Sequence, residues 1–274
     1  MTEFVKRYSH LSEKKDSLLC VGLDPALPKQ RSTNTISTRY LEEGDENEAR
    51  LHFCLDIIDR TKNFCCAYKP NQQYVWGLTK TQHKILINAI DKAEAFSILD
   101  YKLSDIGATT ESAVFHIREC GYDAITFNPL LGNLRTIVNM AHKHKPQIGI
   151  IALTLTSNPE AVRYQKQAII AGKPMYVAIA EDVRKYAADG CVIGATGHVT
   201  EEDIRTVRAE AGEDKLLLIP GIGAQKGDAE KIIKTAGKNV LMNVGRAIIY
   251  SENPAEIADQ YNRTFNKIRK QVGY

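Results

Sequence analysis

The sequence lacks the segments that would place a protein in or across a membrane. Residues 1–16 carry charged side chains throughout and contain no apolar core of the kind that a secretory signal peptide needs. No apolar run in the 274 residues reaches the length of a transmembrane helix. We therefore predict a cytoplasmic protein that makes no contact with a membrane.

Cysteine pairs and cofactor motifs are also missing. The six cysteines include no Cys-x-x-Cys pair, and most lie in apolar runs, as reduced core cysteines of a cytoplasmic protein do. The sequence has no Walker lysine motif, no Gly-x-Gly-x-x-Gly after a strand and no Gly-x-Ser-x-Gly. His142-Lys143-His144 is interpreted as a solvated helix end. These absences argue against a nucleotide cofactor, serine hydrolase chemistry and a metal site.

A strong charge of either sign is absent as well. The net charge is only +3, which argues against nucleic acid as a partner but is compatible with an anionic small-molecule substrate. Hydrophobic residues make up 43% of the chain and charged residues 25%, the composition of a globular protein with a large core.

What the chain does have is a repeated alternation of short apolar runs and helical segments. The runs are continuous, as in strands buried on both faces, and there are eight of them. The predicted strands are Leu18–Leu23, Phe64–Tyr68, Phe96–Leu99, Ala124–Phe127, Ile148–Leu153, Cys191–Ala195, Leu216–Ile219 and Val240–Val244. The predicted helices are Asn47–Lys62, Gly107–Cys120, Leu134–His144, Glu160–Ala188, Glu201–Ala211 and Gly227–Ala236. This pattern predicts a closed parallel (β/α)₈ TIM barrel with outer helices, with a doubly wound open sheet as the alternative.

We expect residues 1–274 to form a single barrel domain, because such barrels commonly reach this length. Two stretches interrupt the pattern. Residues 28–48 are polar and predict an irregular insertion, most simply a solvated surface. Ser157–Pro174 is the longest irregular connection and is our candidate for a mobile cover over the site.

Charged side chains collect where the predicted strands end, which is the face where such barrels build active sites. Asp24 and Lys69 follow the first two strands, and Asp100, Lys102 and Asp105 follow the third. Asp100 and Lys102 lie two residues apart on a strand, so both should point to the same face. Carboxylates beside Lys102 should stabilise its ammonium form, which favours a proton donor over a Schiff-base nucleophile.

The loops after the last two strands suggest a phosphate site. Gly221 and Gly223 follow the seventh strand, and Gly245-Arg246 follows the eighth. Loops at these positions often bind phosphate through backbone N–H groups, and an arginine adds a planar fork of donors.

At this point the chain resembles orotidine 5′-phosphate decarboxylase over nearly its whole length, in the longer bacterial form of the family. The resemblance rests on Gly22-Leu23-Asp24-Pro25, Lys69-Pro70, Asp100-Tyr101-Lys102-Leu103-Ser104-Asp105-Ile106-Gly107, Thr156-Ser157-Asn158-Pro159, Pro220-Gly221-Ile222 with Gln225, and Gly245-Arg246-Ala247-Ile248. Gly223 stands where the family often has arginine, which shifts phosphate binding onto Arg246.

The resemblance implies decarboxylation of orotidine 5′-phosphate to uridine 5′-phosphate, the last step of de novo pyrimidine (UMP) synthesis. It implies a catalytic Lys-Asp-Lys-Asp network of Lys69, Asp100, Lys102 and Asp105, in which Lys102 protonates the C6 carbanion. The implied substrate-binding residues are Asp24, Thr109, Ser157, Gln225, Gly245 and Arg246. It also implies a homodimer with shared active sites, in which Asp105 and Thr109 enter the partner's site, and no cofactor.

Three alternatives stay open at this stage. A Mg²⁺-dependent sugar-phosphate decarboxylase of the same superfamily has a glutamate at the strand end that Lys69 occupies here. A Schiff-base aldolase barrel would use Lys102 as a nucleophile. A catalytically silent phosphate-binding barrel would not need the charged tetrad.

Overall fold

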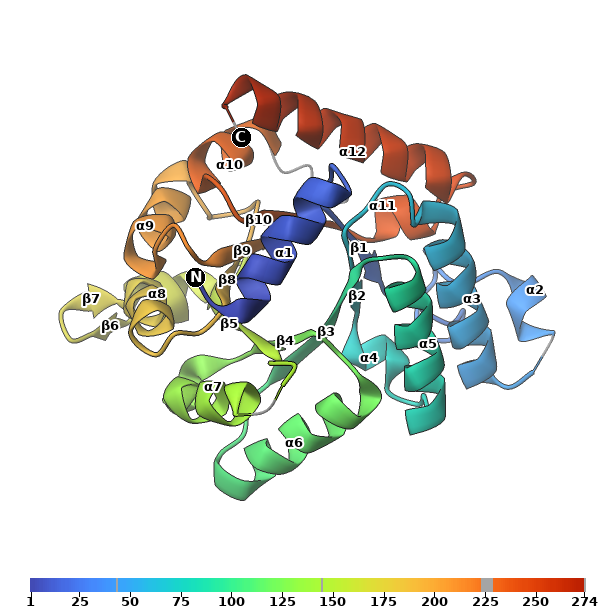
Figure 1. Cartoon of the computed structure of the whole chain (residues 1–274), viewed down its shortest axis with the longest axis horizontal. Helices are drawn as coiled ribbons and strands as arrows, with labels where there is room; N and C mark the ends of the chain where they lie inside the picture. The colour runs from blue at the N-terminus through green and yellow to red at the C-terminus, as the bar shows by residue number, and fades with distance from the viewer. Residues whose placement is uncertain (43, 144, 223–228, 274) are drawn as a thin grey trace.

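The structure is a computed structural model that describes residues 1–42, 44–143, 145–222 and 229–273. Within this part of the chain, eight parallel strands close into a barrel, seen end-on in Figure 1. Around the barrel the order is β1, β2, β3, β4, β5, β8, β9 and β10, and β10 pairs with β1. The bounds are β1 Leu19–Leu23, β2 Ala67–Pro70, β3 Phe96–Leu103, β4 Ala124–Phe127, β5 Gly149–Leu155, β8 Gly190–Ile193, β9 Leu216–Pro220 and β10 Val240–Val244. The predicted TIM barrel is confirmed.

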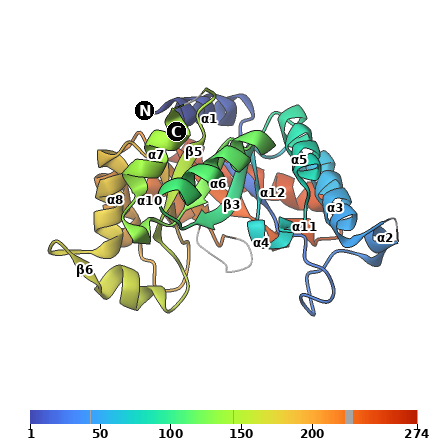
Figure 2. The ribbon, with the colours of Figure 1, turned by 90° about the horizontal axis from the view of Figure 1, so that it is seen from below.

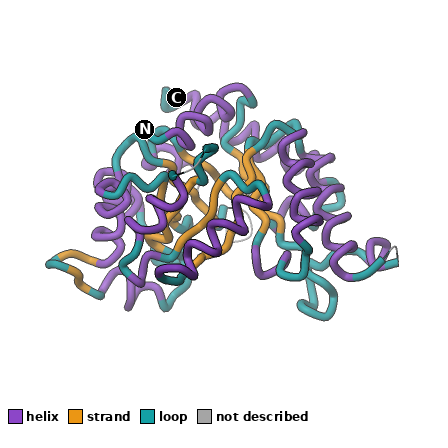
Figure 3. Tube along the Cα trace, turned by 60° about the horizontal axis from the view of Figure 1, so that its bottom comes forward, coloured by secondary structure: helices purple, strands orange, loops and turns teal. Residues whose placement is uncertain are grey.

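Helices surround the strands, as the tube of Figure 3 shows. The longer ones are α3 Glu46–Thr61, α5 Lys80–Lys92, α6 Gly107–Cys120, α7 Leu134–His142, α8 Met175–Lys185, α9 Glu201–Ala211, α10 Ala229–Ala236 and α12 Pro254–Gln271. Short helices follow several strands: α2 Thr38–Leu41, α4 Gln72–Val75, the 3₁₀ turn η1 Pro129–Leu131, the π-helix η2 Val162–Gln167 and α11 Arg246–Ile249. Within the described residues, no helix is long and apolar enough to cross a membrane.

The strands alternate between two cores. Residues such as Ile98, Leu218 and Leu241 point into the barrel, while their neighbours pack outward against the helices. Helix α1 (Glu3–Lys14), which the strand–helix pattern does not include, lies across the amino end of the barrel and places Phe4 and Tyr8 on the interior cluster. Figure 2 shows α1 at one end of the molecule and the α4 and β6 segments toward the other.

The predicted helix Glu160–Ala188 is wrong. In its place the chain forms η2, a hairpin of β6 (Ile169–Ile170) and β7 (Lys173–Pro174), and then α8. The hairpin turn places Ala171 and Gly172 at positive φ, and Pro174 cannot donate a helical hydrogen bond, so a continuous helix is excluded here. The expected helix ends His144 and Gly227 lie outside the described residues.

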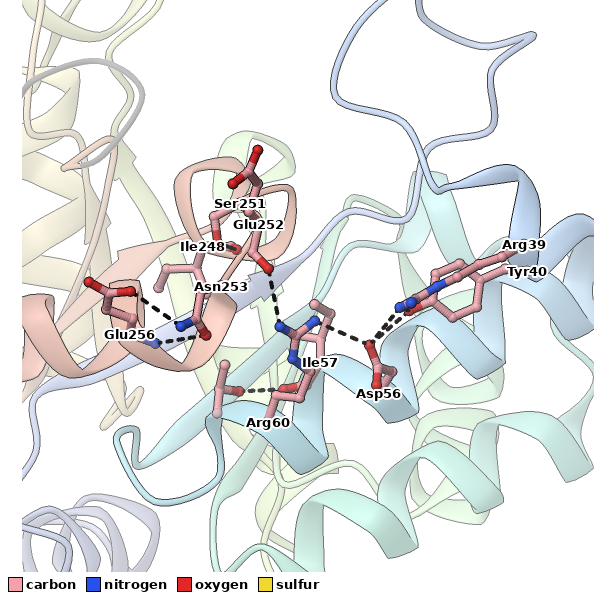
Figure 4. A network of polar contacts seen from close by, with 11 residues as sticks. Arg39, Tyr40, Asp56, Ile57, Arg60, Ile248, Ser251, Glu252, Asn253 and Glu256 are labelled. Carbon is pink, nitrogen blue, oxygen red and sulfur yellow. Dashed lines mark hydrogen bonds and ion pairs between the residues drawn. The ribbon is translucent and has the colours of Figure 1, made fainter.

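The region expected as an insertion is tied to the barrel by polar contacts (Figure 4). On α2, Tyr40 Oη donates to Asp56 Oδ2 at 2.8 Å, and Arg39 pairs with the same carboxylate. Arg60 contacts Asp56 from the other side and donates to the Glu252 carbonyl at 3.3 Å. This network connects α2 through α3 to the turn that follows α11.

Candidate active site

A buried carboxylate between two lysines forms the centre of the site. Lys69 Nζ lies 2.5 Å from Asp100 Oδ2, and Lys102 Nζ lies 2.6 Å from Asp100 Oδ1. The side chains of Lys69 and Asp100 are 7% and 12% exposed, whereas that of Lys102 is 50% exposed. Lys69 and Asp100 are thus fixed in the barrel mouth, and Lys102 reaches from it toward solvent.

Strand β3 brings Asp100 and Lys102 together through an irregularity that simple alternation does not predict. Its register against β4 shifts between Leu99 and Leu103, and Lys102 has a φ of 51°. Thr126 on β4 holds this bulge: the Lys102 N–H donates to Thr126 Oγ1 at 2.9 Å, and that hydroxyl donates to Asp100 Oδ1 at 3.1 Å. A left-handed conformation at a non-glycine residue is costly and is typical of functional sites.

The charges of Asp100 and Lys69 depend on each other. Burial would raise the pKa of the Asp100 carboxyl, but Lys69 and Lys102 outweigh it and hold that pKa well below its usual range. Burial would lower the pKa of Lys69, yet Asp100 and Asp24 raise it overall. Asp100 is therefore a carboxylate and Lys69 an ammonium at neutral pH.

Asp24 lies on the same side of the mouth, just after β1. Its backbone is held by Tyr250, whose Oη donates to the Asp24 carbonyl at 2.6 Å and accepts from the Ala26 N–H at 2.8 Å. Its Oδ1 is buried and receives no hydrogen bond from the described residues. Asn243 Oδ1 on β10 is also buried and receives no hydrogen bond from the described residues. Asn243 is recognised as a polar residue at the end of the eighth predicted strand, but no sequence motif assigns it a role.

Arg246 begins α11 directly after β10 and is exposed. Within the described ranges no side chain pairs with it, and the half-buried Gly245 precedes it. Gln225 and Gly223, the other residues considered for a phosphate site, lie outside the described residues.

A cavity of about 230 Å³ opens at the charged centre. Lys69, Asp100, Lys102 and Thr126 line one side of it, and the apolar side chains Leu153, Val192 and Leu218 come from β5, β8 and β9. Ser157 and its neighbours Thr156 and Asn158 complete the lining after β5. The cavity thus combines an apolar wall with a charged one.

Asp105, the fourth residue of the Lys-Asp-Lys-Asp network, makes no hydrogen bond or ion pair with Lys69, Asp100 or Lys102 among the described residues of the chain. Its Oδ1 accepts from the Ile106 N–H at 2.8 Å, and its carbonyl accepts from Asn133 Nδ2. Helix α6 has Ile106 as its N-cap, so Asp105 does not cap it in the usual way. Thr109, in the first turn of α6, is exposed.

These observations define a (β/α)₈-barrel enzyme with a lysine–aspartate site at the carboxyl ends of its strands. Comparison with known proteins gives the family. The chain belongs to the orotidine 5′-phosphate decarboxylase / HUMPS family, whose sequence model matches residues 17–261.

Relatives match over nearly the full chain. The orotidine 5′-phosphate decarboxylase of Cupriavidus metallidurans is 33% identical over 285 aligned positions, covering 97% of this chain and 98% of that protein. That of Azoarcus sp. is 35% identical over 260 positions, covering 90% and 89%. Among solved structures, an orotidine-monophosphate decarboxylase from Toxoplasma gondii superposes with a TM-score of 0.82 at 26% identity, covering 97% of both chains.

Proposed function

We propose that this protein decarboxylates orotidine 5′-phosphate to uridine 5′-phosphate. The observation that carries the proposal is the Lys69–Asp100–Lys102 arrangement on one wall of a cavity whose other wall is apolar. The orotate ring of the substrate has flat faces suited to the apolar wall and a charged carboxylate on one edge. Family membership and the names of the relatives support the same reaction.

The proposed reaction is a proton-for-carbon-dioxide exchange at C6. The C6–carboxylate bond breaks, carbon dioxide leaves, and its bonding electrons stay on C6 as a carbanion. The Lys102 ammonium, preorganised by Asp100 at 2.6 Å, stabilises this charge and then donates its proton to C6. The ionised Asp100 faces the substrate carboxylate, where like charges disfavour the bound ground state.

The rest of the substrate would lie along the strand ends. Asp24 and Lys69 bind the ribose hydroxyls, and Ser157 faces the pyrimidine. Gln225, Gly245 and Arg246 hold the phosphate, with Arg246 supplying the positive charge. Binding energy from this remote phosphate is used in the transition state. In this proposal no metal or organic cofactor takes part, and the two ammonium groups that donate to Asp100 disfavour a cation at that carboxylate.

The proposal includes a homodimer with shared sites. Trp76, Ile106, Leu130 and Leu131 follow β2, β3 and β4 and are 73%, 60%, 63% and 51% exposed. Large apolar side chains exposed in one sector of the mouth are typical of an interface. Asp105 and Thr109 lie in this sector, so a two-fold axis here would carry both into the partner's site.

Residues 157–174 are the proposed cover of the pyrimidine. Their π-helix contacts the strand ends through two side chains. Gln165 Oε1 accepts from the Thr156 N–H at 2.7 Å, and Lys166 Nζ donates to the His198 carbonyl at 3.1 Å and pairs with Asp203. The β6–β7 hairpin extends beyond these contacts.

We place the whole reaction in the cytoplasm, as the last step of pyrimidine synthesis in a single barrel domain, without nucleic acid or membrane.

The test is to mix the purified protein with orotidine 5′-phosphate and follow the loss of orotate-ring absorbance, with and without EDTA. We expect turnover to uridine 5′-phosphate at the same rate in both. Absence of turnover by folded protein would overturn the proposal. Activity that EDTA abolishes and Mg²⁺ restores would overturn its cofactor-free form.

A further inference from the structure

Asn243 is the inward-facing residue of β10 at the barrel mouth. On this strand Leu241 belongs to the interior cluster, while Val240, Met242 and Val244 pack outward, so alternation turns Asn243 inward one step above Leu241. Asn243 pairs with Cys20 on β1, and Gly22, two residues further along β1, pairs with Lys69 on β2, so the amide lies next to the charged end of the barrel interior.

Gly22 on the neighbouring strand makes room for this amide. A β-carbon on Gly22 would lie 3.2 Å from both Asn243 Oδ1 and the Gly245 Cα atom. A β-carbon on Gly245 would lie 3.8 Å from Asp24 Oδ2. The Asp24 carboxylate and the Asn243 amide therefore flank the same corner, formed by the backbones of two glycines.

Both side chains at this corner present a buried oxygen that lacks a donor. Asp24 Oδ1 and Asn243 Oδ1 receive no hydrogen bond from any described residue. Buried acceptors are nearly always paired in folded proteins, because leaving one unpaired costs its hydration. Both acceptors belong to side chains at the Gly22–Gly245 corner of the barrel mouth, and a ligand with two neighbouring donors would satisfy them.

We propose that Asn243 is a substrate-binding residue whose Oδ1 accepts a hydrogen bond from a ribose hydroxyl, next to the hydroxyl that Asp24 takes. This assignment rests on the proposed function, in which the substrate is a nucleotide with a vicinal ribose diol. A diol supplies two adjacent O–H donors, which matches the two acceptors. An amide suits this position better than a second carboxylate, because it accepts without repelling Asp24 or competing with Asp100 for Lys69.

The experiment compares Asn243→Ala with the wild type on three substrates: orotidine 5′-phosphate and its 2′-deoxy and 3′-deoxy analogues. With the full substrate we expect kcat/KM to fall by about three- to tenfold, the size of one lost neutral hydrogen bond. With the analogue that lacks the partner hydroxyl, the variant and the wild type should be alike. Loss of the same size on all three substrates, or no loss on any, would overturn the assignment.

Asn266 on α12 provides the matched control. It is also an asparagine with a buried, unpaired Oδ1, but its Nδ2 donates to the Asp16 carbonyl at the amino end of the barrel. Asn266→Ala should leave kcat/KM unchanged on every substrate. Failure of the wild type to turn over orotidine 5′-phosphate would instead refute the proposed function, so the two failures are distinguishable.

Gly22→Ala gives a second route if Asn243→Ala does not fold. The φ of Gly22 is not in the left-handed region, and the added carbon would lie 3.2 Å from both Asn243 Oδ1 and the Gly245 Cα atom, so the side-chain amide or the Gly245 backbone must move by a few tenths of an ångström. We expect the same pattern, a loss of kcat/KM that disappears with one deoxy analogue. An equal loss on all three substrates would contradict the proposal here too.

Discussion

The two ends of the barrel use the same eight strands in opposite ways. At the amino end the interior is apolar and closed: Phe4 and Tyr8 of α1 are 1% and 2% exposed, and Tyr8 Oη donates to the Val240 carbonyl at 2.6 Å. At the carboxyl end the interior turns polar, with Lys69, Asp100 and two unpaired acceptors. The amino end therefore contributes packing and stability, whereas the carboxyl end holds the charged and unpaired groups that a ligand can contact.

Changing Lys102 to Ala should give the largest effect on activity. The side chain is half exposed, so the fold should survive, but the proposed proton donor is lost and kcat should fall by at least about 10²- to 10⁴-fold. Steady-state kinetics on protein verified by circular dichroism would measure this. Lys92→Ala, at the exposed end of α5, is the control and should match the wild type. Near-normal turnover by folded Lys102→Ala would remove Lys102 from the chemistry.

Phe4→Ala should affect stability but not activity, because Phe4 lies at the amino end of the barrel. Removing this buried ring should lower the free energy of unfolding by about 3–5 kcal/mol. The kcat/KM of the remaining folded protein should stay unchanged. Urea denaturation and kinetics on the same preparation would measure both. Phe115, which is 56% exposed, offers the matched Phe→Ala control with little loss of stability. An equal drop in stability for both variants would contradict the role given to α1.

Asp100→Asn should show how the contribution of the buried Lys69–Asp100 pair to the free energy of unfolding depends on pH. Losing one partner of such a pair should cost about 3 kcal/mol at neutral pH. The pKa of Asp100 is depressed in the folded state, so its contribution is present above its unfolded pKa of about 3.9 and is lost as pH falls through the folded value. The pKa of Lys69 is raised, so its contribution is present below its unfolded pKa of about 10.4 and is lost as pH rises through the folded value.

The difference in unfolding free energy between wild type and Asp100→Asn should therefore shrink as pH falls below about 4, where Asp100 loses its charge in the unfolded and then in the folded wild type. Denaturation curves at a series of pH values would measure it. A difference that grows as pH falls below about 4 would contradict the pairing.

Arg246→Ala should have the smallest effect on the fold and an intermediate one on activity. The exposed guanidinium makes no pair with the described side chains, so stability should be unchanged. Loss of a charge-assisted phosphate contact should lower kcat/KM by roughly 10- to 100-fold. Arg263→Ala on α12 is the control, since its side chain is 80% exposed at a distance from the mouth. Unchanged kcat/KM would refute the phosphate assignment.

The sequence predicts the bounds of several helices and strands, but it does not predict features that depend on tertiary contacts. Helices α6 and α9 and strands β4 and β10 have the bounds expected from apolar periodicity, because that periodicity reflects burial directly. The hairpin after η2 was missed, since Ala171 and Gly172 break a segment that is otherwise helical in composition. The bulge at Lys102 depends on Thr126, 24 residues away, which no local pattern encodes.

The candidate site also contains residues that the sequence predicts and a residue whose role it does not predict. Lys69, Asp100 and Lys102 could be predicted to meet, because charges at the ends of neighbouring strands share one face. Asn243 could be placed at the end of its strand, but a role for it could not be predicted, because a single polar residue in an apolar strand matches no motif. The role proposed for Asn243 rests on its closeness to Gly22 and on the Gly22–Gly245 corner that it shares with Asp24. These residues are far apart in the sequence and meet only in the closed barrel.

Mixing two inactive proteins tests most directly whether Lys102 and Asp105 act together in one site built by two subunits. Lys102→Ala and Asp105→Ala are each purified, combined under conditions where subunits exchange, and assayed with orotidine 5′-phosphate. The mixed dimer would contain one site with both native residues, so activity should reappear in proportion to the mixed dimer formed. If mass spectrometry shows the mixed dimer and the mixture stays inactive, Asp105 does not complete the site of its partner.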